Sequence, residues 1–155
     1  MASEPVSYVN YLKVDELLSL QQPLSDGPEH DELLFIVIHQ TYELWFKQLL
    51  HELSRLRLLL REANLHPALG TLKRVRTIMK TLVSQVDILE TMTPLEFNSF
   101  RARLEASSGF QSYQFREFER VFARPGIWDD VVEFLRANSP NDGALEVESM
   151  LLTTY

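Results

Sequence analysis

Two side chains with useful chemistry stand out in this sequence: a histidine inside an apolar run, and an arginine beside phenylalanines. His39 lies within "LLFIVIHQTYELWFKQLLHEL", where most neighbours are large and apolar. A buried imidazole costs free energy unless it makes a hydrogen bond, so its partner is either another protein group or a polar ligand. The residues alone leave both interpretations open.

Helical spacing predicts aromatic rings around this histidine. Phe35 and Phe46 lie four residues before and seven residues after His39, so a helix places all three on one face. His51 is about 18 Å farther along the same helix and cannot share a metal ion with His39. The side chains of residues 30–32, "HDE", diverge at a helix start, which favours a solvated first turn. No metal site is therefore predicted.

The arginine is Arg101, which follows Phe97 by four residues and Phe100 directly. A guanidinium beside aromatic rings can bind a carboxylate through two parallel hydrogen bonds. The alternative is a surface arginine whose stem lies over Phe97. Downstream, Ser108 and Gly109 either offer hydroxyl and N–H groups to a ligand or simply end a helix.

The spacing of apolar residues predicts helices throughout. Gly and Pro number only 5 and 7 and cluster at a few points, which separate the predicted helices. A capping box at Thr93 and Glu96, with Pro94 in the first turn, predicts one helix start. No alternating stretch indicates a sheet, so we expect an all-α helical bundle. The predicted helices span residues 8–20, 29–62, 67–92, 93 to about 108, 111–123 and a short stretch after Pro125.

Local composition also predicts burial along the longest helix. Residues 33–38 are apolar on every side, which is typical of a helix buried all round. Charged residues return after Leu50, so we expect the far end of this helix at the surface. Tyr8 and Leu12 share a face of the first helix, whose apolar stripe is modest.

Length and charge limit the function classes. The 155 residues and 18.0 kDa suit a single helical domain over 1–155. A net charge of −7 argues against binding to nucleic acid or an anionic membrane, and the absence of Cys excludes disulfides and thiolate metal sites. The start shows no leader pattern, and no apolar run approaches the roughly 20 residues of a membrane span. We expect a cytoplasmic protein.

Four segments in order resemble the N-terminal half of the tryptophan 2,3-dioxygenase family. They are "YVNYLKVDELLSLQQPLS", "HDELLFIVIHQTYELWFKQLLHEL", "ETMTPLEFNSFR" and "SSGFQS". The resemblance covers about residues 8–118, and we expect residues 124–155 to form a divergent C-terminal helix and tail. It implies a helical bundle of the tryptophan/indoleamine dioxygenase type, truncated, that uses haem b and O2 to open the indole ring of L-tryptophan or a related indole amino acid, giving N-formylkynurenine in the kynurenine pathway.

The resemblance also assigns roles to individual residues. It implies a homotetramer in which the N-terminal segment of one subunit completes a neighbour's pocket. His39 matches the distal histidine that accepts a hydrogen bond from the indole N–H, and Arg101 matches the arginine that holds the substrate carboxylate. The other matching pocket residues are Phe35 beside the indole, Phe97 on the pocket wall, Ser108 before the glycine, and Tyr8 and Leu12 from the neighbouring subunit.

The family's proximal haem ligand is a histidine of the C-terminal half, and nothing after Phe122 resembles it or the threonine-rich loop over the substrate ammonium. Three accounts remain open: part of a split or oligomeric enzyme whose partner chain supplies the ligand; an inactive protein that binds an indole amino acid; or a helical oligomerisation protein. A related haem-dependent aromatic hydroxylase is a fourth account and lacks the same ligand.

Overall fold

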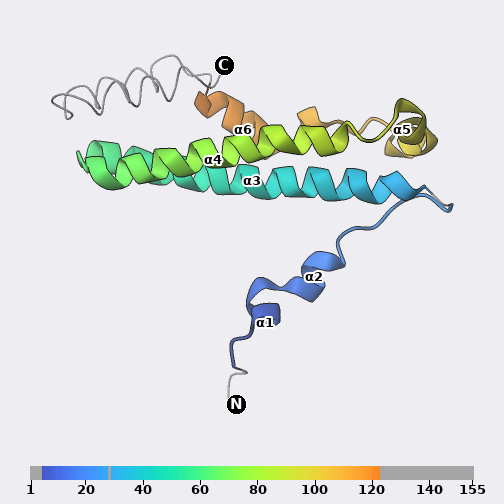
Figure 1. The fold of residues 1–155 in the computed structure, drawn as a ribbon, viewed down its shortest axis with the longest axis horizontal. Helices are drawn as coiled ribbons and strands as arrows, with labels where there is room; N and C mark the ends of the chain where they lie inside the picture. Colours follow the sequence, from blue (N-terminus) through green and yellow to red (C-terminus); the bar gives the residue numbers. More distant parts are fainter. Residues whose placement is uncertain (1–4, 28, 123–155) are drawn as a thin grey trace. The chain divides into compact units, whose positions relative to one another are not determined.

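The computed structural model describes residues 5–27 and 29–122, and all regular structure within them is helical (Figure 1). This confirms the all-α prediction. The helix predicted after Pro125 lies outside the described residues. The described elements are α1 (Tyr8–Leu12), α2 (Val14–Leu18), α3 (His30–Arg61), α4 (Leu65–Leu89), α5 (Pro94–Arg101), the short 3-10 helices η1 (Ala102–Leu104) and η2 (Gly109–Gln111), and α6 (Tyr113–Phe122).

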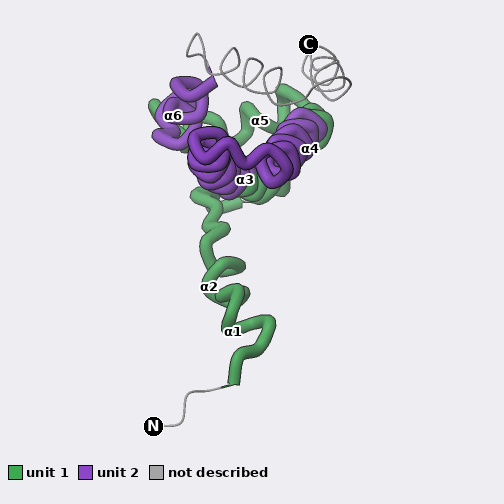
Figure 2. The backbone as a smooth tube through the Cα atoms, turned by 90° about the vertical axis from the view of Figure 1, so that its left-hand side faces the viewer, with its two compact units in different colours: residues 1–41, 85–107 green, residues 42–84, 108–155 purple. Residues whose placement is uncertain are grey.

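The chain divides into two compact units, each built from two separate stretches of sequence (Figure 2). The first unit comprises residues 1–41 and 85–107, and the second comprises residues 42–84 and 108–155. The single domain over 1–155 stays a prediction. None of the helices in the described ranges is both long enough and apolar enough to cross a membrane.

The second unit contains the main hydrophobic core, where α3 and α4 run side by side (Figure 1). Leucines at positions 49, 53, 56 and 59 of α3 are buried, at the three- and four-residue spacing of one helix face. They pack with Ala68, Leu72, Val75, Ile78 and Leu82 of α4 and with partly buried aromatic residues of α6. The expectation of a surface location beyond Leu50 was therefore wrong for this face. The arginines that suggested it lie on the opposite face, which is exposed.

Polar contacts fix the register of these helices. Glu52 of α3 is buried, and both of its carboxylate oxygens accept hydrogen bonds from Nη1 of Arg74, at 3.0 and 3.1 Å. Gln114 of α6 donates to the backbone and side-chain oxygens of Glu43 at 2.9 and 2.8 Å. A buried carboxylate is costly unless its lone pairs are satisfied, so these contacts favour a single arrangement of the three helices.

The end of α3 is set by backbone geometry. Ala63 takes a left-handed conformation with φ 52°, and the N–H of Asn64 donates to the carbonyl of Leu59 at 2.9 Å. Together with the hydrogen bond from Ala63 to Leu60 at 3.1 Å, this is a Schellman motif. The predicted boundaries of 29–62 agree with the observed helix because the motif stops α3 at the predicted place.

In the first unit, the apolar start of α3 is buried on one face only. Ile38 is buried, whereas Leu33 and Val37 are 48% and 40% exposed in the described chain. The prediction of burial on every side was therefore wrong. The chain's own described residues cover one side of this helix, and its other apolar face stays open to solvent.

The N-terminal segment forms two short helices instead of the predicted single one. Lys13, with φ 55°, ends α1 in a left-handed conformation and precedes α2. Neither short helix contains a buried residue. Five-residue helices gain little from their own hydrogen bonds, so without a buried stripe nothing favours one continuous helix.

The segment between α2 and α3 is tied to α3 by a buried carboxylate. Glu32 is 1% exposed and accepts hydrogen bonds from the backbone N–H groups of Leu24 at 2.6 Å and Ser25 at 3.1 Å. Gln40 adds a second tie, because it bonds the side chain of Gln21 and the carbonyl of Leu20.

The start of α5 was predicted correctly. Thr93 donates its N–H to Glu96 at 2.7 Å and accepts the N–H of Glu96 at 3.3 Å, which is the expected capping box. The helix ends at Arg101, before the serines that were expected to end it, and η1 continues as a tighter turn.

Glu32 should make stability depend on pH. Its burial opposes ionisation, but the polar groups of Ser25 and the backbone N–H of Leu24 outweigh this and lower the pKa of Glu32. Because the pKa of Glu32 is lower in the folded state than in the unfolded state, its ionised carboxylate stabilises the fold at pH values above the unfolded-state pKa. This stabilisation is lost as the pH falls through the folded-state pKa. We expect Glu32→Gln to lower the free energy of unfolding by about 1–3 kcal/mol near pH 7. In urea titrations, the difference from the wild type should shrink below about pH 4.

The exposed Glu62 provides the control. Glu62→Gln should stay within about 0.5 kcal/mol of the wild type. A Glu32→Gln difference that stays constant from neutral to acidic pH would contradict the assigned role.

Candidate functional site

An aromatic cluster in the first unit joins α3 to α5. The ring of Phe35 lies 4.1 Å from that of His39 and 5.8 Å from that of Phe97, measured between centroids. Phe100 lies 5.6 Å from Phe35 and 5.5 Å from Phe97, and it is completely buried. The fold thus brings together three predicted pocket residues, Phe35, His39 and Phe97, with Phe100 as their buried support.

The His39 ring is held in one orientation by its own helix. Its Nδ1 lies 2.7 Å from the backbone oxygen of Phe35. A carbonyl can only accept, so Nδ1 carries the hydrogen, and in the neutral ring Nε2 keeps an acceptor lone pair. No hydrogen bond from the described residues reaches Nε2, and the ring is only partly buried. The imidazole therefore has both a protein partner and a free acceptor.

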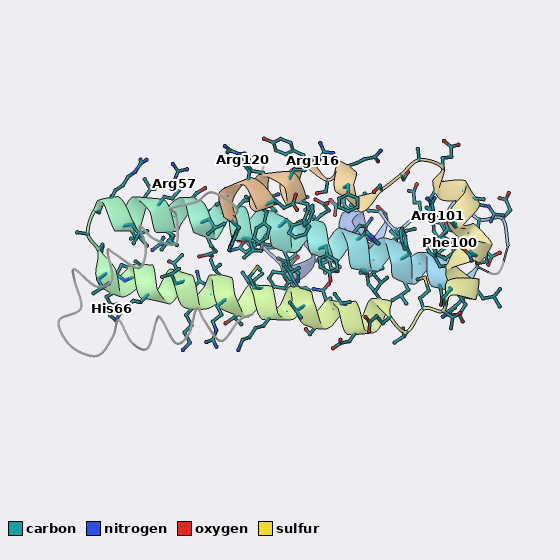
Figure 3. The ribbon with its side chains drawn as sticks, turned by 90° about the horizontal axis from the view of Figure 1, so that it is seen from above. Arg57, His66, Phe100, Arg101, Arg116 and Arg120 are labelled. Carbon is teal, nitrogen blue, oxygen red and sulfur yellow. The ribbon has the colours of Figure 1, made fainter. Side chains whose placement is uncertain are left out.

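Arg101 follows Phe100 at the end of α5 and is exposed in the described chain (Figure 3). Its Nη1 donates to the backbone oxygen of Glu105 at 3.0 Å. No other hydrogen bond within the described residues engages the guanidinium. One edge, formed by Nε and Nη2, keeps two parallel donors, which is the geometry that binds a carboxylate through two hydrogen bonds.

Ser108 lies in the second unit, where it begins η2. Its hydroxyl oxygen accepts the N–H of Phe110 at 3.3 Å, and its own N–H donates to Gln111 at 3.4 Å. Gly109 is the first residue of η2, so of the two interpretations left open the one in which it simply ends a helix does not hold. The Ser108 hydroxyl hydrogen is not used by the cap and can still be donated to a ligand.

Tyr8 and Leu12 lie on α1 and are 75% and 46% exposed. No ring contact or hydrogen bond joins either side chain to the aromatic cluster within the described residues. The described chain therefore gathers Phe35, His39 and Phe97, places Arg101 one helical turn after Phe97, and leaves Tyr8 and Leu12 without a site of their own.

Comparison with known proteins identifies the family. The family model described as tryptophan 2,3-dioxygenase matches residues 1–124. The chain belongs to the tryptophan 2,3-dioxygenase family. The resemblance inferred from four sequence segments is thereby confirmed, and the match extends beyond residues 8–118 at both ends.

Several curated members of the tryptophan 2,3-dioxygenase family are close in sequence. A tryptophan 2,3-dioxygenase of Herpetosiphon aurantiacus is 50% identical over 160 aligned residues, which cover 88% of this chain and 62% of the relative. One of Anaeromyxobacter sp. (strain K) is 60% identical over 122 residues, covering 79% and 45%. One of Caulobacter vibrioides is 51% identical over 143 residues, covering 92% and 52%. The chain spans about half the length of the curated relatives it matches.

The described histidines do not fit a complete haem site. A haem iron needs a strong axial ligand that projects from an apolar slot. His30, His51 and His66 are exposed, and the resemblance matches His39 to the histidine on the substrate side of the haem, not to the axial ligand. The described residues also contain no group of three His, Cys, Asp or Glu side chains suited to a metal ion. The described residues therefore do not supply the axial ligand of a haem.

Sequence patterns missed two contributors to the site. The carbonyl of Phe35 orients His39, and the carbonyl of Glu105 holds Arg101. Both contributors are backbone carbonyls, which every residue type has. The identity of the side chains at positions 35 and 105 therefore could not have predicted them. The one available clue was the four-residue spacing in each pair.

The tautomer of His39 can be measured directly. In ¹⁵N-detected NMR of the neutral ring, we expect Nδ1 to appear protonated and Nε2 unprotonated, because the carbonyl of Phe35 requires a donor. The exposed His66, to which the described structure gives no hydrogen bond, is the control and should show a mixture of tautomers. A protonated Nε2 on neutral His39 would contradict the assignment.

Proposed function

We propose that this chain holds the substrate in a haem-dependent tryptophan 2,3-dioxygenase, as part of a split or oligomeric enzyme. The ligand is L-tryptophan or a closely related indole amino acid, and the product of the complete enzyme is N-formylkynurenine. The single observation that carries the proposal is the free Nε2 of His39 beside the Phe35 ring. Membership of the family and the open edge of Arg101 support it.

The candidate residues would contact different parts of the ligand. Phe35 and Phe97 offer flat apolar surfaces to an indole, which favours stacked or edge-on contact. Nε2 of His39 would accept the indole N–H, which would otherwise be buried without a partner at a cost of about 1–3 kcal/mol. The open edge of Arg101 would bind the carboxylate. Ser108, which the resemblance assigns to substrate binding, stays a prediction.

The chemistry with O2 belongs to the haem that the family resemblance implies. Because the described residues do not provide its axial ligand, we infer that a partner chain supplies it. The role derived for this chain is to bind and orient the amino acid. The cytoplasmic location also stays a prediction.

Calorimetry with L-tryptophan, with and without added haemin, tests the binding role. We expect Arg101→Ala and His39→Leu each to weaken binding by about 10-fold or more, since each removes a directed hydrogen-bond partner. Tryptamine, which lacks the carboxylate, should bind wild type and Arg101→Ala equally. An L-tryptophan analogue methylated at the indole nitrogen should bind wild type and His39→Leu equally.

Arg103→Ala is the matched control, because Arg103 is an exposed arginine next to the same helix end that bonds only the carbonyl of Ser99, at 3.4 Å. It should leave the affinity for L-tryptophan unchanged. Wild-type protein that binds no L-tryptophan, with or without haemin, would refute the proposal.

We further propose that Tyr8 and Leu12 close the pocket of a neighbouring copy, in a homotetramer with exchanged N-terminal segments. The exposure of both side chains and the absence of any buried residue in α1 and α2 support it. Large apolar and aromatic side chains exposed together commonly mark an interaction surface. The hydrogen bonds from Leu24 and Ser25 to Glu32 would fix the point at which the exchanged N-terminal segment departs from its own subunit.

Mixing two defective variants tests the exchange. We expect Tyr8→Ala and Arg101→Ala each to bind L-tryptophan poorly, and a co-refolded mixture to recover part of the binding, since some pockets then combine both intact residues. The apparent mass in light scattering should exceed the 18.0 kDa of one chain. A clean monomer, or a mixture no better than its components, would contradict the exchange.

A further inference from the structure

Glu105 adopts a backbone conformation that its side chain disfavours. Its φ and ψ are 48° and −120°, in the left-handed half of conformational space. It is the second residue of a turn closed by the hydrogen bond from the N–H of Ser107 to the carbonyl of Leu104, at 2.8 Å. These angles match the first central position of a type II′ turn, where glycine dominates. A glutamate there stores strain, and such strain persists only where surrounding contacts maintain it.

The same unusual conformation aims the Glu105 carbonyl at Arg101. The Nη1 of Arg101 donates to this oxygen at 3.0 Å. Had the 3-10 helix η1 continued, the carbonyl of Glu105 would point onward along the helix axis, toward residues that follow it. The φ and ψ of Glu105 instead direct this oxygen toward the Arg101 guanidinium. The strained backbone conformation of Glu105 is therefore what places the acceptor that holds the Arg101 guanidinium.

The carbonyl also decides which donors of Arg101 remain open. A guanidinium has five N–H donors, and the bond to Glu105 uses one of the two on Nη1. The Nε–Nη2 edge is untouched in the described structure and keeps two parallel donors. A long exposed arginine otherwise samples many rotamers, and ordering it on binding costs free energy. Tethering Nη1 in advance reduces that cost.

We propose that Glu105 is a positioning residue, whose strained backbone carbonyl pre-orients Arg101 so that its Nε–Nη2 edge faces the carboxylate of the amino-acid ligand. The inference rests on the proposed function, in which Arg101 holds that carboxylate. It assigns no role to the Glu105 side chain, which is exposed. Replacements should therefore be tolerated according to how well they accept a positive φ.

The experiment compares Glu105→Val with Glu105→Gly and Glu105→Gln in the full chain. A β-branched residue is the least compatible with positive φ, so Glu105→Val should displace the carbonyl and weaken L-tryptophan binding about 5- to 10-fold. Glu105→Gly and Glu105→Gln should bind as the wild type does, and Glu105→Gly should also raise the melting temperature by about 2–6 °C. Tryptamine should bind all four proteins equally, because it lacks the carboxylate that Arg101 would hold.

A purely structural role predicts a different pattern. If Glu105→Val weakens L-tryptophan and tryptamine alike, or has no effect on either, the positioning role is overturned. If Glu105→Gln weakens L-tryptophan binding as much as Glu105→Val does, the effect arises from the Glu105 side chain. That result would also overturn the positioning role of the carbonyl. In the Arg101→Ala background, Glu105→Val should cause no further loss.

A second measurement needs no ligand. Side-chain ¹⁵N relaxation of the Arg101 Nε–H group should show greater mobility in Glu105→Val than in wild type, and wild-type mobility in Glu105→Gln. Unchanged mobility in Glu105→Val would overturn the positioning of Arg101 even if calorimetry showed no ligand binding by any variant. Failure of wild type to bind L-tryptophan, with mobility changed as expected, would instead refute the proposed function and leave the carbonyl's hold on Arg101 established.

Discussion

The hydrogen bond from Nδ1 of His39 to the carbonyl of Phe35 is the interaction on which the site depends. That oxygen also belongs to the backbone ladder of α3, and its second lone pair lets it serve both partners. The bond selects one tautomer, presents Nε2 as an acceptor and keeps the imidazole 4.1 Å from the Phe35 ring. A ring free to rotate would offer an indole no defined partner. The Phe35 ring and the Nε2 acceptor could then no longer contact the same ligand.

The two compact units show different kinds of packing. In the second, leucines from α3 and α4 form a continuous aliphatic core, and a buried carboxylate with its arginine fixes the register. In the first, the buried centre is the Phe100 ring, surrounded by other aromatic side chains, while apolar residues of α3 remain exposed. A ligand pocket needs accessible apolar walls on a rigid support, so the exposed apolar residues beside the buried Phe100 suit the proposed binding role.

Backbone carbonyls position both candidate ligand-binding side chains. The Phe35 oxygen orients an imidazole, and the Glu105 oxygen tethers a guanidinium. In both pairs the side chain bonds a carbonyl four residues away in sequence. Positioning of this kind is short-range and needs no distant element, so each group is held by the helix or turn that carries it. The tilted ring contact between Phe35 and Phe97 then joins α3 to α5.

The helical class, the long helices, the capping box of α5 and the family could all be predicted from the sequence, because they follow from spacing, local hydrogen bonds and ordered motifs. The sequence also marked His39, Arg101, Phe35 and Phe97 as candidate ligand-binding residues. Which apolar faces are covered could be seen only in the folded chain. Residues 33–38 were expected to be buried on every side and are partly exposed, whereas leucines of residues 49–59 form part of the core. Periodicity shows that a face is apolar but not what packs against it. Likewise, only the folded backbone shows the positive φ of Glu105, because that angle depends on the contacts that hold the turn and not on the residue's own preference.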